Sequence, residues 1–161
     1  MKKRKFDLIN ILKYAMVVVF IAYIALLVSQ ENTDDVPVKT ISQNMLKVTN
    51  TDGMSQGTTQ DLKKYYGLNA NDYDGVMLYI PDDVMSVNEI LVVKLKNQEQ
   101  ANEVEQAVKK RLKTQKSSFE GYGVNQTKLL NSAITETKGN YVMMVISEDA
   151  EKIFEAFKNS I

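Results

Sequence analysis

The stretch from Glu89 to Leu112, EILVVKLKNQEQANEVEQAVKKRL, predicts a strand that is followed directly by a helix. Apolar residues alternate with other residues from Leu91 to Leu95, which is the pattern of a half-buried strand. Asn97 follows the strand, and Gln100 stands three residues later, at the spacing of a capping box. Apolar residues then recur at three- and four-residue intervals, which predicts an amphipathic helix. The inner face of this helix is predicted to hold Ala101, Val104, Val108, Leu112, Gln115 and Phe119.

A second unit of the same kind closes the chain, with the sequence NYVMMVISEDAEKIFEAFKNSI at residues 140–161. Its apolar run predicts a strand, and Ser147 is placed to cap the helix that follows. Each unit also has a partner strand upstream. Residues 75–80 are expected to pair with 90–96, and 132–138 with 140–146 across a tight Gly-Asn turn.

Two short helices, at residues 38–49 and 59–67, are predicted before the first unit, with a loop rich in Gly, Thr and Ser between them. We therefore predict an α+β domain with a mainly antiparallel four-stranded sheet and helices packed on one face. The similarity of the two strand–helix units fits either a duplication or a common supersecondary unit.

An apolar stretch, YAMVVVFIAYIALLVSQ at residues 14–30, carries no charge and predicts one N-terminal transmembrane helix. A buried core helix would be amphipathic, and this stretch is apolar on all sides. A cleaved signal peptide would need small residues before the cleavage site, and residues 27–29 (Leu-Val-Ser) do not provide them. We therefore favour an uncleaved anchor over both alternatives.

The charges on either side of this stretch orient it. Lys and Arg precede it and acidic residues follow it, which places the N-terminus in the cytoplasm by the positive-inside rule. The sequence thus predicts a cytoplasmic basic segment at 1–13, the anchor at 14–30, a stalk at 31–37 and an extracytoplasmic domain at 38–161. The expected location is the cell membrane, with a single crossing through residues 14–30.

Charge and composition exclude several function classes. The chain has 20 basic and 20 acidic residues, but residues 1–28 carry a net charge of about +4 and the remainder about −4. An acidic domain repels phosphate backbones, so we expect no nucleic-acid partner. There is no Cys, no His and no Trp, which removes thiol nucleophiles, disulfides and the commonest general base and zinc ligand. We predict no cofactor, no metal site and no catalytic residues.

Acidic residues gather around the first predicted hairpin, namely Asp72, Asp74, Asp82, Asp83 and Glu89. Calcium binding and carboxylate catalysis both use such groups, but solvated turn residues are the simpler interpretation. A basic run ends the long helix, namely Lys109, Lys110, Arg111, Lys113 and Lys116. It could dock an acidic partner or lie near anionic headgroups, although cations at a helix C-terminus also suit the helix dipole.

Four residues form our binding-site hypothesis: Glu89, Arg111, Glu120 and Tyr122. We expect them to come together beside the loop that joins the first two strands. Tyr122 lies in a glycine-flanked segment, SSFEGYG, where an aromatic ring could stack on a ligand or seal the edge of the core.

Three segments carry a resemblance to a known family: LKKYYGLNANDYDGVMLYIP at 62–81, NEILVVKLKNQEQANEVEQAVKKRLKTQKSSFEGYG at 88–123 and KGNYVMMVISEDAEKIFEAF at 138–157. In order and spacing they resemble the bacterial domain of unknown function 4358 family, over roughly residues 38–161. The resemblance implies a small exported protein of Gram-positive bacteria, anchored by a lipid-modified Cys or by a helix. Because this chain has no Cys, it resembles the helix-anchored members. No activity is implied.

The function we expect is that of a membrane-anchored, extracytoplasmic binding or interaction module, non-enzymatic, with an envelope protein as partner. One alternative is a carboxylate-dependent hydrolase of cell-envelope material, which needs a concave pocket with two carboxyl groups about 5–10 Å apart. Another is a structural accessory subunit of a membrane complex, which needs an exposed apolar patch.

Overall fold

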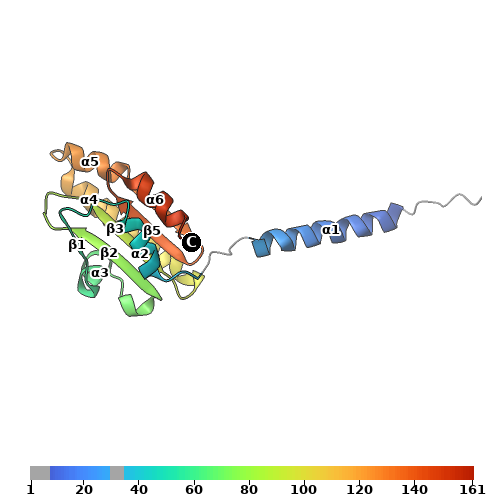
Figure 1. The fold of residues 1–161 in the computed structure, drawn as a ribbon. Coiled ribbons are helices and arrows are strands. Elements are labelled where there is room, and N and C mark those ends of the chain that lie inside the picture. Colours follow the sequence, from blue (N-terminus) through green and yellow to red (C-terminus); the bar gives the residue numbers. More distant parts are fainter. Residues whose placement is uncertain (1–7, 30–34) are drawn as a thin grey trace, which may run out of the picture. The chain divides into compact units, whose positions relative to one another are not determined.

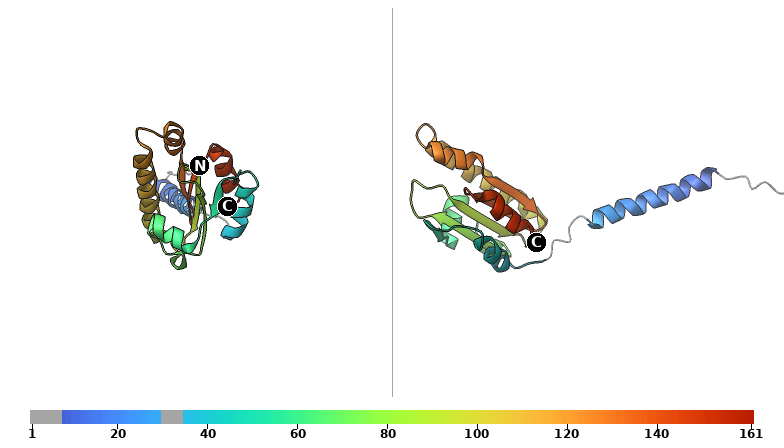
Figure 2. Two further views of the ribbon diagram at one scale, coloured as in Figure 1. Left: turned by 90° about the vertical axis from the view of Figure 1, so that its left-hand side faces the viewer. Right: turned by 45° about the horizontal axis from the view of Figure 1, so that its top comes forward.

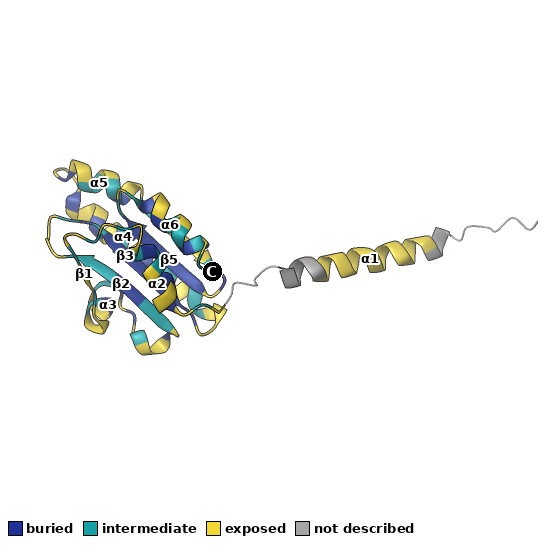
Figure 3. Ribbon diagram, in the orientation of Figure 1, coloured by how far each residue is buried: buried dark blue, intermediate teal, exposed yellow. Residues whose placement is uncertain are grey.

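The structure is a computed structural model that describes the backbone of residues 8–29 and 35–161 and the side chains of residues 11–24 and 35–161. The chain divides into two units, Met1–Asn32 and Thr33–Ile161. In the first unit, α1 (Leu8–Ser29) is one helix of 22 residues. Its described side chains, residues 11–24, are all exposed (Figure 3).

Among the residues that the structure describes, no helix combines the length and the apolar character needed to cross a membrane. Parts of the predicted N-terminal organisation lie outside the described residues. They are residues 1–7 of the basic segment, Gln30 of the predicted anchor and residues 31–34 of the stalk.

The second unit is an α+β domain, as predicted (Figure 1). Its elements in chain order are α2 (Val38–Leu46), β1 (Met54–Gln56), α3 (Thr59–Tyr66), the 3₁₀ turn η1 (Ala70–Asp72), β2 (Gly75–Pro81), β3 (Glu89–Lys94), the 3₁₀ turn η2 (Gln98–Gln100), α4 (Ala101–Phe119), α5 (Val124–Asn131), β4 (Ile134–Lys138), β5 (Tyr141–Ile146) and α6 (Ala150–Lys158).

The sheet is antiparallel throughout and has five strands in the order β1-β2-β3-β5-β4, so the prediction of four strands was wrong. The additional strand, β1, pairs with the end of β2 through Met54↔Pro81 and Gln56↔Tyr79. It lies in the segment that was expected to be a loop. A three-residue edge strand of MSQ has no alternation of apolar residues, so no periodic signal announces it.

Helices cover both faces of the sheet, so the prediction of helices on one face was also wrong. α3, α4 and α5 pack with Leu91 and Val93 of β3, whereas α2 and α6 pack with Ile90 and Val92. Figure 2, in its left-hand view, shows the helices on the two sides of the sheet. Every residue of β3 and of β5 is buried, because a central strand between two helical layers has no face toward solvent.

The predicted hairpins and the capping box at Asn97 are confirmed, whereas the prediction that Ser147 caps the last helix was wrong, because α6 has Asp149 at its N-cap position. β2 pairs with β3, and β4 pairs with β5 so that Lys138 faces Tyr141 and only Gly139 and Asn140 form the turn. Gly139 has φ of 52°, a conformation that glycine adopts without steric cost. Asn97 and Gln100 form a capping box, which starts η2 and leads into α4.

The two β-β-α units are not congruent. β3 and β5 are antiparallel neighbours, so the two hairpins can be exchanged only by a twofold axis perpendicular to the sheet. Such a rotation does not move a helix to the other face, so two congruent units would have α4 and α6 on the same face. α4 nevertheless packs on the face of Leu91, and α6 packs on the face of Val92. The units therefore have opposite hands, and of the two explanations for their similarity the fold favours a common supersecondary unit.

Candidate functional site

Two of the four residues in the binding-site hypothesis meet in the core. Arg111, on α4, donates through Nε and Nη2 to the carboxylate of Glu89, the first residue of β3, at 3.1 Å and 2.8 Å. Gln115 Nε2, one turn further along α4, donates to Glu89 Oε2 at 3.3 Å. The hydroxyl of Tyr66, at the end of α3, donates to Glu89 Oε1. The helical spacing predicted Gln115 on the inner face of α4, but no local sequence pattern connects it or Tyr66 with Glu89.

The charges of this cluster stabilise one another. Glu89 is fully buried, and the side chain of Arg111 is 12% exposed. Burial lowers the pKa of Arg111, but the hydrogen bonds and the charge of Glu89 outweigh this effect and raise the pKa. Burial, with the neighbouring Glu89 carboxylate, raises the pKa of Tyr66 well above its ordinary value. The ring of Tyr65 lies 4.4 Å from the Arg111 guanidinium, a cation–π contact.

This cluster connects elements of the fold and offers no open group for chemistry. Its donors come from α3 and α4 and its acceptor from β3, so it fixes both helices on one face of the sheet. The carboxylate of Glu89 has no exposed surface and four donor atoms already bind it. A substrate could reach it only if the core opened.

The other two residues of the hypothesis lie elsewhere. Glu120 follows Arg111 by nine positions, which is about 13 Å along a helix. It lines a surface groove between α4 and α5 instead of the buried cluster. Tyr122 is 63% exposed, its ring lies 5.8 Å from that of Phe119, and its hydroxyl donates to the carbonyl of Ser118. Glu89 and Arg111 therefore lie together in the core, whereas Glu120 and Tyr122 lie at the surface near the end of α4.

The groove beside Glu120, here called the lysine groove, has a volume of about 540 Å³. It is lined by Lys109, Leu112, Lys113, Lys116, Ser117, Glu120, Gly121, Thr127 and Asn131. The three lysines follow each other at four- and three-residue spacing, so they share one face of α4. Lys109 lies 3.7 Å from Glu105, whereas neither Lys113 nor Lys116 has an ion pair with any residue that the structure describes.

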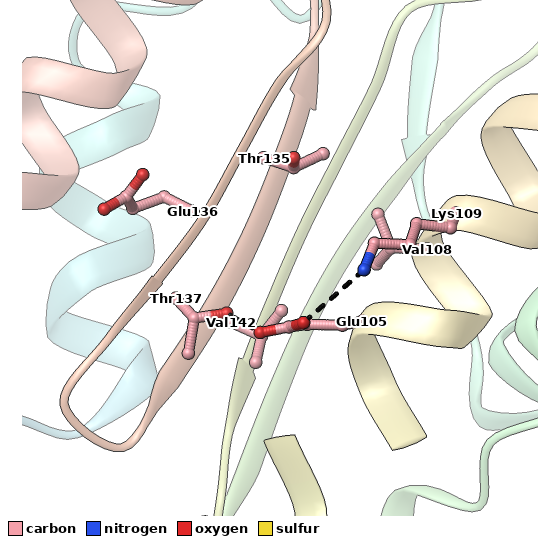
Figure 4. A pocket seen from close by; sticks show the side chains of 7 residues that line it. All are labelled: Glu105, Val108, Lys109, Thr135, Glu136, Thr137 and Val142. Carbon is pink, nitrogen blue, oxygen red and sulfur yellow. Dashed lines mark hydrogen bonds and ion pairs between the residues drawn. The ribbon is translucent and has the colours of Figure 1, made fainter. Parts of the chain in front are cut away.

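A smaller pocket, of about 320 Å³, lies between α4 and the edge strand β4 and is lined by two carboxylates, Glu105 and Glu136 (Figure 4). Thr137 Oγ1 donates to Glu105 Oε1 at 2.7 Å, so the side chain of Thr137 faces α4. Glu136 precedes it on the strand and points to the opposite face of the sheet. Figure 4 shows the Glu136 carboxylate directed away from Glu105. The two carboxylates do not converge as a glycosidase pair must.

The acidic residues around the first hairpin have local roles. Asp83 Oδ1 accepts from the backbone N–H of Met85 at 2.8 Å, as expected of a turn residue, and Asp82 accepts from the hydroxyl of Ser55. Asp74 forms an ion pair with Lys94 at 2.9 Å. Within the described part of the chain, no three acidic residues lie close enough together to hold a metal ion.

Lys94 is a buried charge that the sequence analysis missed, because it assigned this residue to the solvent side of a half-buried strand. Its ammonium binds Asp35 at 2.5 Å and Asp74 at 2.9 Å, and its side chain is only 6% exposed. Next to it, the hydroxyl of Tyr141 donates to the carbonyl of Val36 at 2.6 Å. Together they attach the first described residues of the domain to one end of β3 and β5.

These observations define a class: a small α+β domain with a five-stranded antiparallel sheet between two helical layers, buried ion pairs at Glu89 and at Lys94, and an open basic groove. The profile of a known family, described as Domain of unknown function (DUF4358), matches residues 47–147. The chain belongs to that family, which confirms the resemblance stated above. Searches among curated proteins and among solved structures found no match.

Proposed function

We propose that this chain is a membrane-anchored, non-enzymatic binding module, and that its lysine groove takes an acidic segment of an envelope protein. One observation carries the proposal. Lys113 and Lys116 line a groove of about 540 Å³, where three lysines outnumber the one carboxylate, Glu120, and neither of them forms an ion pair with an acidic residue that the structure describes. Their charge is therefore available to an anionic partner.

The other groove residues fit such a partner. Leu112 provides an apolar floor, and Thr127 and Asn131 on α5 provide groups that hydrogen-bond an extended backbone. Residues 38–161 contain 15 basic and 16 acidic residues, so the domain has no net positive charge that would attract a long polyanion beyond the groove. A short acidic segment needs only the local attraction of the groove lysines, since exposed charges more than about 10 Å apart are largely screened.

The anchor part of the proposal rests on residues 14–30, which carry no charge, and on the helical backbone of α1 from Leu8 to Ser29. The proposed span includes Gln30, beyond the described part of α1. Basic residues before it and acidic residues after it support a cytoplasmic N-terminus. The binding domain then faces the cell envelope.

The absence of cysteine gives a direct test of this topology. Lys3→Cys and Lys138→Cys each introduce one thiol, in the basic segment and in the β4–β5 hairpin. In intact cells, a membrane-impermeant maleimide should label Lys138→Cys and leave Lys3→Cys unlabelled until the membrane is permeabilised. Labelling of both variants in intact cells, or of neither, contradicts the proposed topology.

The groove is tested with the full chain in nanodiscs of neutral lipid and a fluorescent 12-residue peptide that contains six consecutive Glu residues. We expect Lys113→Gln/Lys116→Gln to weaken binding roughly tenfold, since two exposed ion pairs each contribute up to about 1 kcal/mol. The matched control is Lys110→Gln/Lys128→Gln, which makes the same change of charge on α4 and α5 outside the groove lining. Equal weakening in both double variants indicates nonspecific attraction and rejects the groove.

A further inference from the structure

The exposed apolar side chains of the domain gather in two loops. Val84 and Met85, in the loop between β2 and β3, are 88% and 49% exposed. Tyr122 and Val124, at the turn between α4 and α5, are 63% and 81% exposed. Of the large apolar side chains that are exposed in the described domain, only Val48 lies outside these loops. Such clustering differs from the single apolar residues that normally occur on protein surfaces.

The two loops are held side by side. Gln126 Nε2, in the first turn of α5, donates to the backbone carbonyl of Met85 at 2.9 Å. This bond joins the start of α5 to the β2–β3 loop, across 41 residues of sequence. The four apolar residues lie on the two segments that this bond brings together, and we call them the loop patch (Val84, Met85, Tyr122 and Val124).

The loop patch and the lysine groove are formed by neighbouring parts of the chain. Glu120 and Gly121 line the groove and lead directly into Tyr122, and Gly121 turns the chain with φ of 87°. On the other side, Thr127 lines the groove and follows Gln126. On both sides of the α4–α5 turn, groove residues are therefore followed or preceded directly by residues of the segments that carry the patch.

We propose that the loop patch receives apolar residues at one end of the acidic segment that occupies the lysine groove; this inference rests on the proposed function. The partner is then an amphipathic segment, with carboxylates on the lysines and bulky apolar side chains at the α4–α5 turn. Asp82 and Asp83 begin the β2–β3 loop, and their charge directs the carboxylates of the segment away from the patch. The same acids oppose an anionic lipid surface and a second copy of the chain.

The test uses the full chain in neutral nanodiscs and three fluorescent peptides: six Glu residues alone, and the same run with Leu-Phe-Leu added at its N-terminus or at its C-terminus. We expect one of the extended peptides to bind about tenfold more tightly than the Glu peptide. Val84→Ser/Val124→Ser should remove this gain and leave binding of the Glu peptide unchanged. Lys113→Gln/Lys116→Gln should weaken binding of both.

The outcomes separate the two proposals. Val48→Ser is the control, because it removes an exposed valine outside the patch. The loop patch is rejected, while the groove stands, if the Leu-Phe-Leu extension adds no affinity. It is also rejected if Val84→Ser/Val124→Ser lowers the affinity for the Glu peptide as much as the affinity for the extended peptide. If the lysine variant changes neither peptide, the groove proposal fails, and the loop patch fails with it as part of that site. Self-association of the nanodisc-free chain in detergent that Val84→Ser/Val124→Ser abolishes would identify a second copy as the occupant and overturn the inference.

Discussion

The Nη2 atom of Arg111 lies 2.8 Å from Oε2 of Glu89, which joins the middle of α4 to the first residue of β3. The carboxylate is fully buried, so this ion pair connects a helix to the sheet within the core. A buried pair contributes little net stability by itself, but the loss of one partner leaves a buried charge without compensation. The sequence analysis expected these residues to meet as a binding site, whereas the structure places them in the interior.

Replacing Arg111 tests this role. Arg111→Leu should lower the free energy of unfolding by about 3–5 kcal/mol, because Glu89 stays buried without a cation. Glu89→Leu/Arg111→Leu should be more stable than Arg111→Leu alone, since it removes both charges. Urea denaturation of the detergent-solubilised chain measures both values. A cost below about 1 kcal/mol for the single variant would show that water reaches Glu89.

The alkaline side of the stability profile should depend on Tyr73. Burial, followed by the carboxylates of Glu103 and Asp72, raises the pKa of Tyr73 to about 12, whereas an unfolded tyrosine titrates near 10. The folded state therefore holds this proton more tightly. The stabilisation is complete below pH 10 and is lost as the pH rises from 10 to about 12.

Tyr73→Phe should reduce this loss, because it removes one group whose ionisation opposes folding. Unfolding free energies of the wild type and of the variant, measured by urea denaturation at intervals from pH 8 to pH 12, provide the comparison. Parallel curves over this range would show that Tyr73 does not contribute to the alkaline loss.

The Lys94 ion pairs predict that the stability of the domain depends on pH in opposite directions in the wild type and in a variant without Asp35 and Asp74. Burial lowers the pKa of Lys94, but its hydrogen bonds to Asp35 and Asp74 outweigh this effect and raise it. In the wild type, the resulting stabilisation is present below the ordinary lysine pKa and is lost as the pH rises through the raised value. In Asp35→Asn/Asp74→Asn, both carboxylates are absent and burial shifts the pKa of Lys94 downward, so the folded state favours the neutral amine.

The double variant should therefore be less stable at pH 7, by about 1–3 kcal/mol, and this difference should shrink as the pH approaches 10. Adding Lys94→Met to it should restore stability at pH 7, because the buried charge is then absent. Urea denaturation at pH 7 and pH 10 checks both expectations. A difference from wild type that does not change with pH would contradict the explanation.

Gly57 sets a limit on side-chain volume beside β2. A Cβ atom at this position would lie 2.6 Å from Cγ and Cδ2 of Leu78, which is 3% exposed and part of the core. Gly57→Ala should therefore destabilise the domain by about 1–3 kcal/mol through overpacking. Gly57→Ala/Leu78→Ala, compared with Leu78→Ala alone, is the control: the cost of the alanine at position 57 should become smaller once Leu78 is shortened, because only Cβ of residue 78, at 3.2 Å, then remains close.

Local sequence patterns determined much of this protein. The alternation and the cap from Glu89 to Leu112 specify β3 and α4, and the Gly139-Asn140 pair specifies the β4–β5 hairpin. These features are predictable because strand period, helix period and turn chemistry depend on residues that are close in sequence. The helical spacing likewise placed Gln115 on the inner face of α4, where it is buried.

Only the tertiary structure decided which surfaces meet. Both faces of β3 are covered because α2 and α6 pack opposite α3 and α4, and this second layer is what buries Lys94. The partners of Glu89 come from two helices, 22 to 26 positions away in sequence on one side and 23 on the other. The loop patch likewise depends on a hydrogen bond between the start of α5 and a loop 41 residues earlier in the sequence. Contacts of this kind arise from how layers pack, and no local period encodes them.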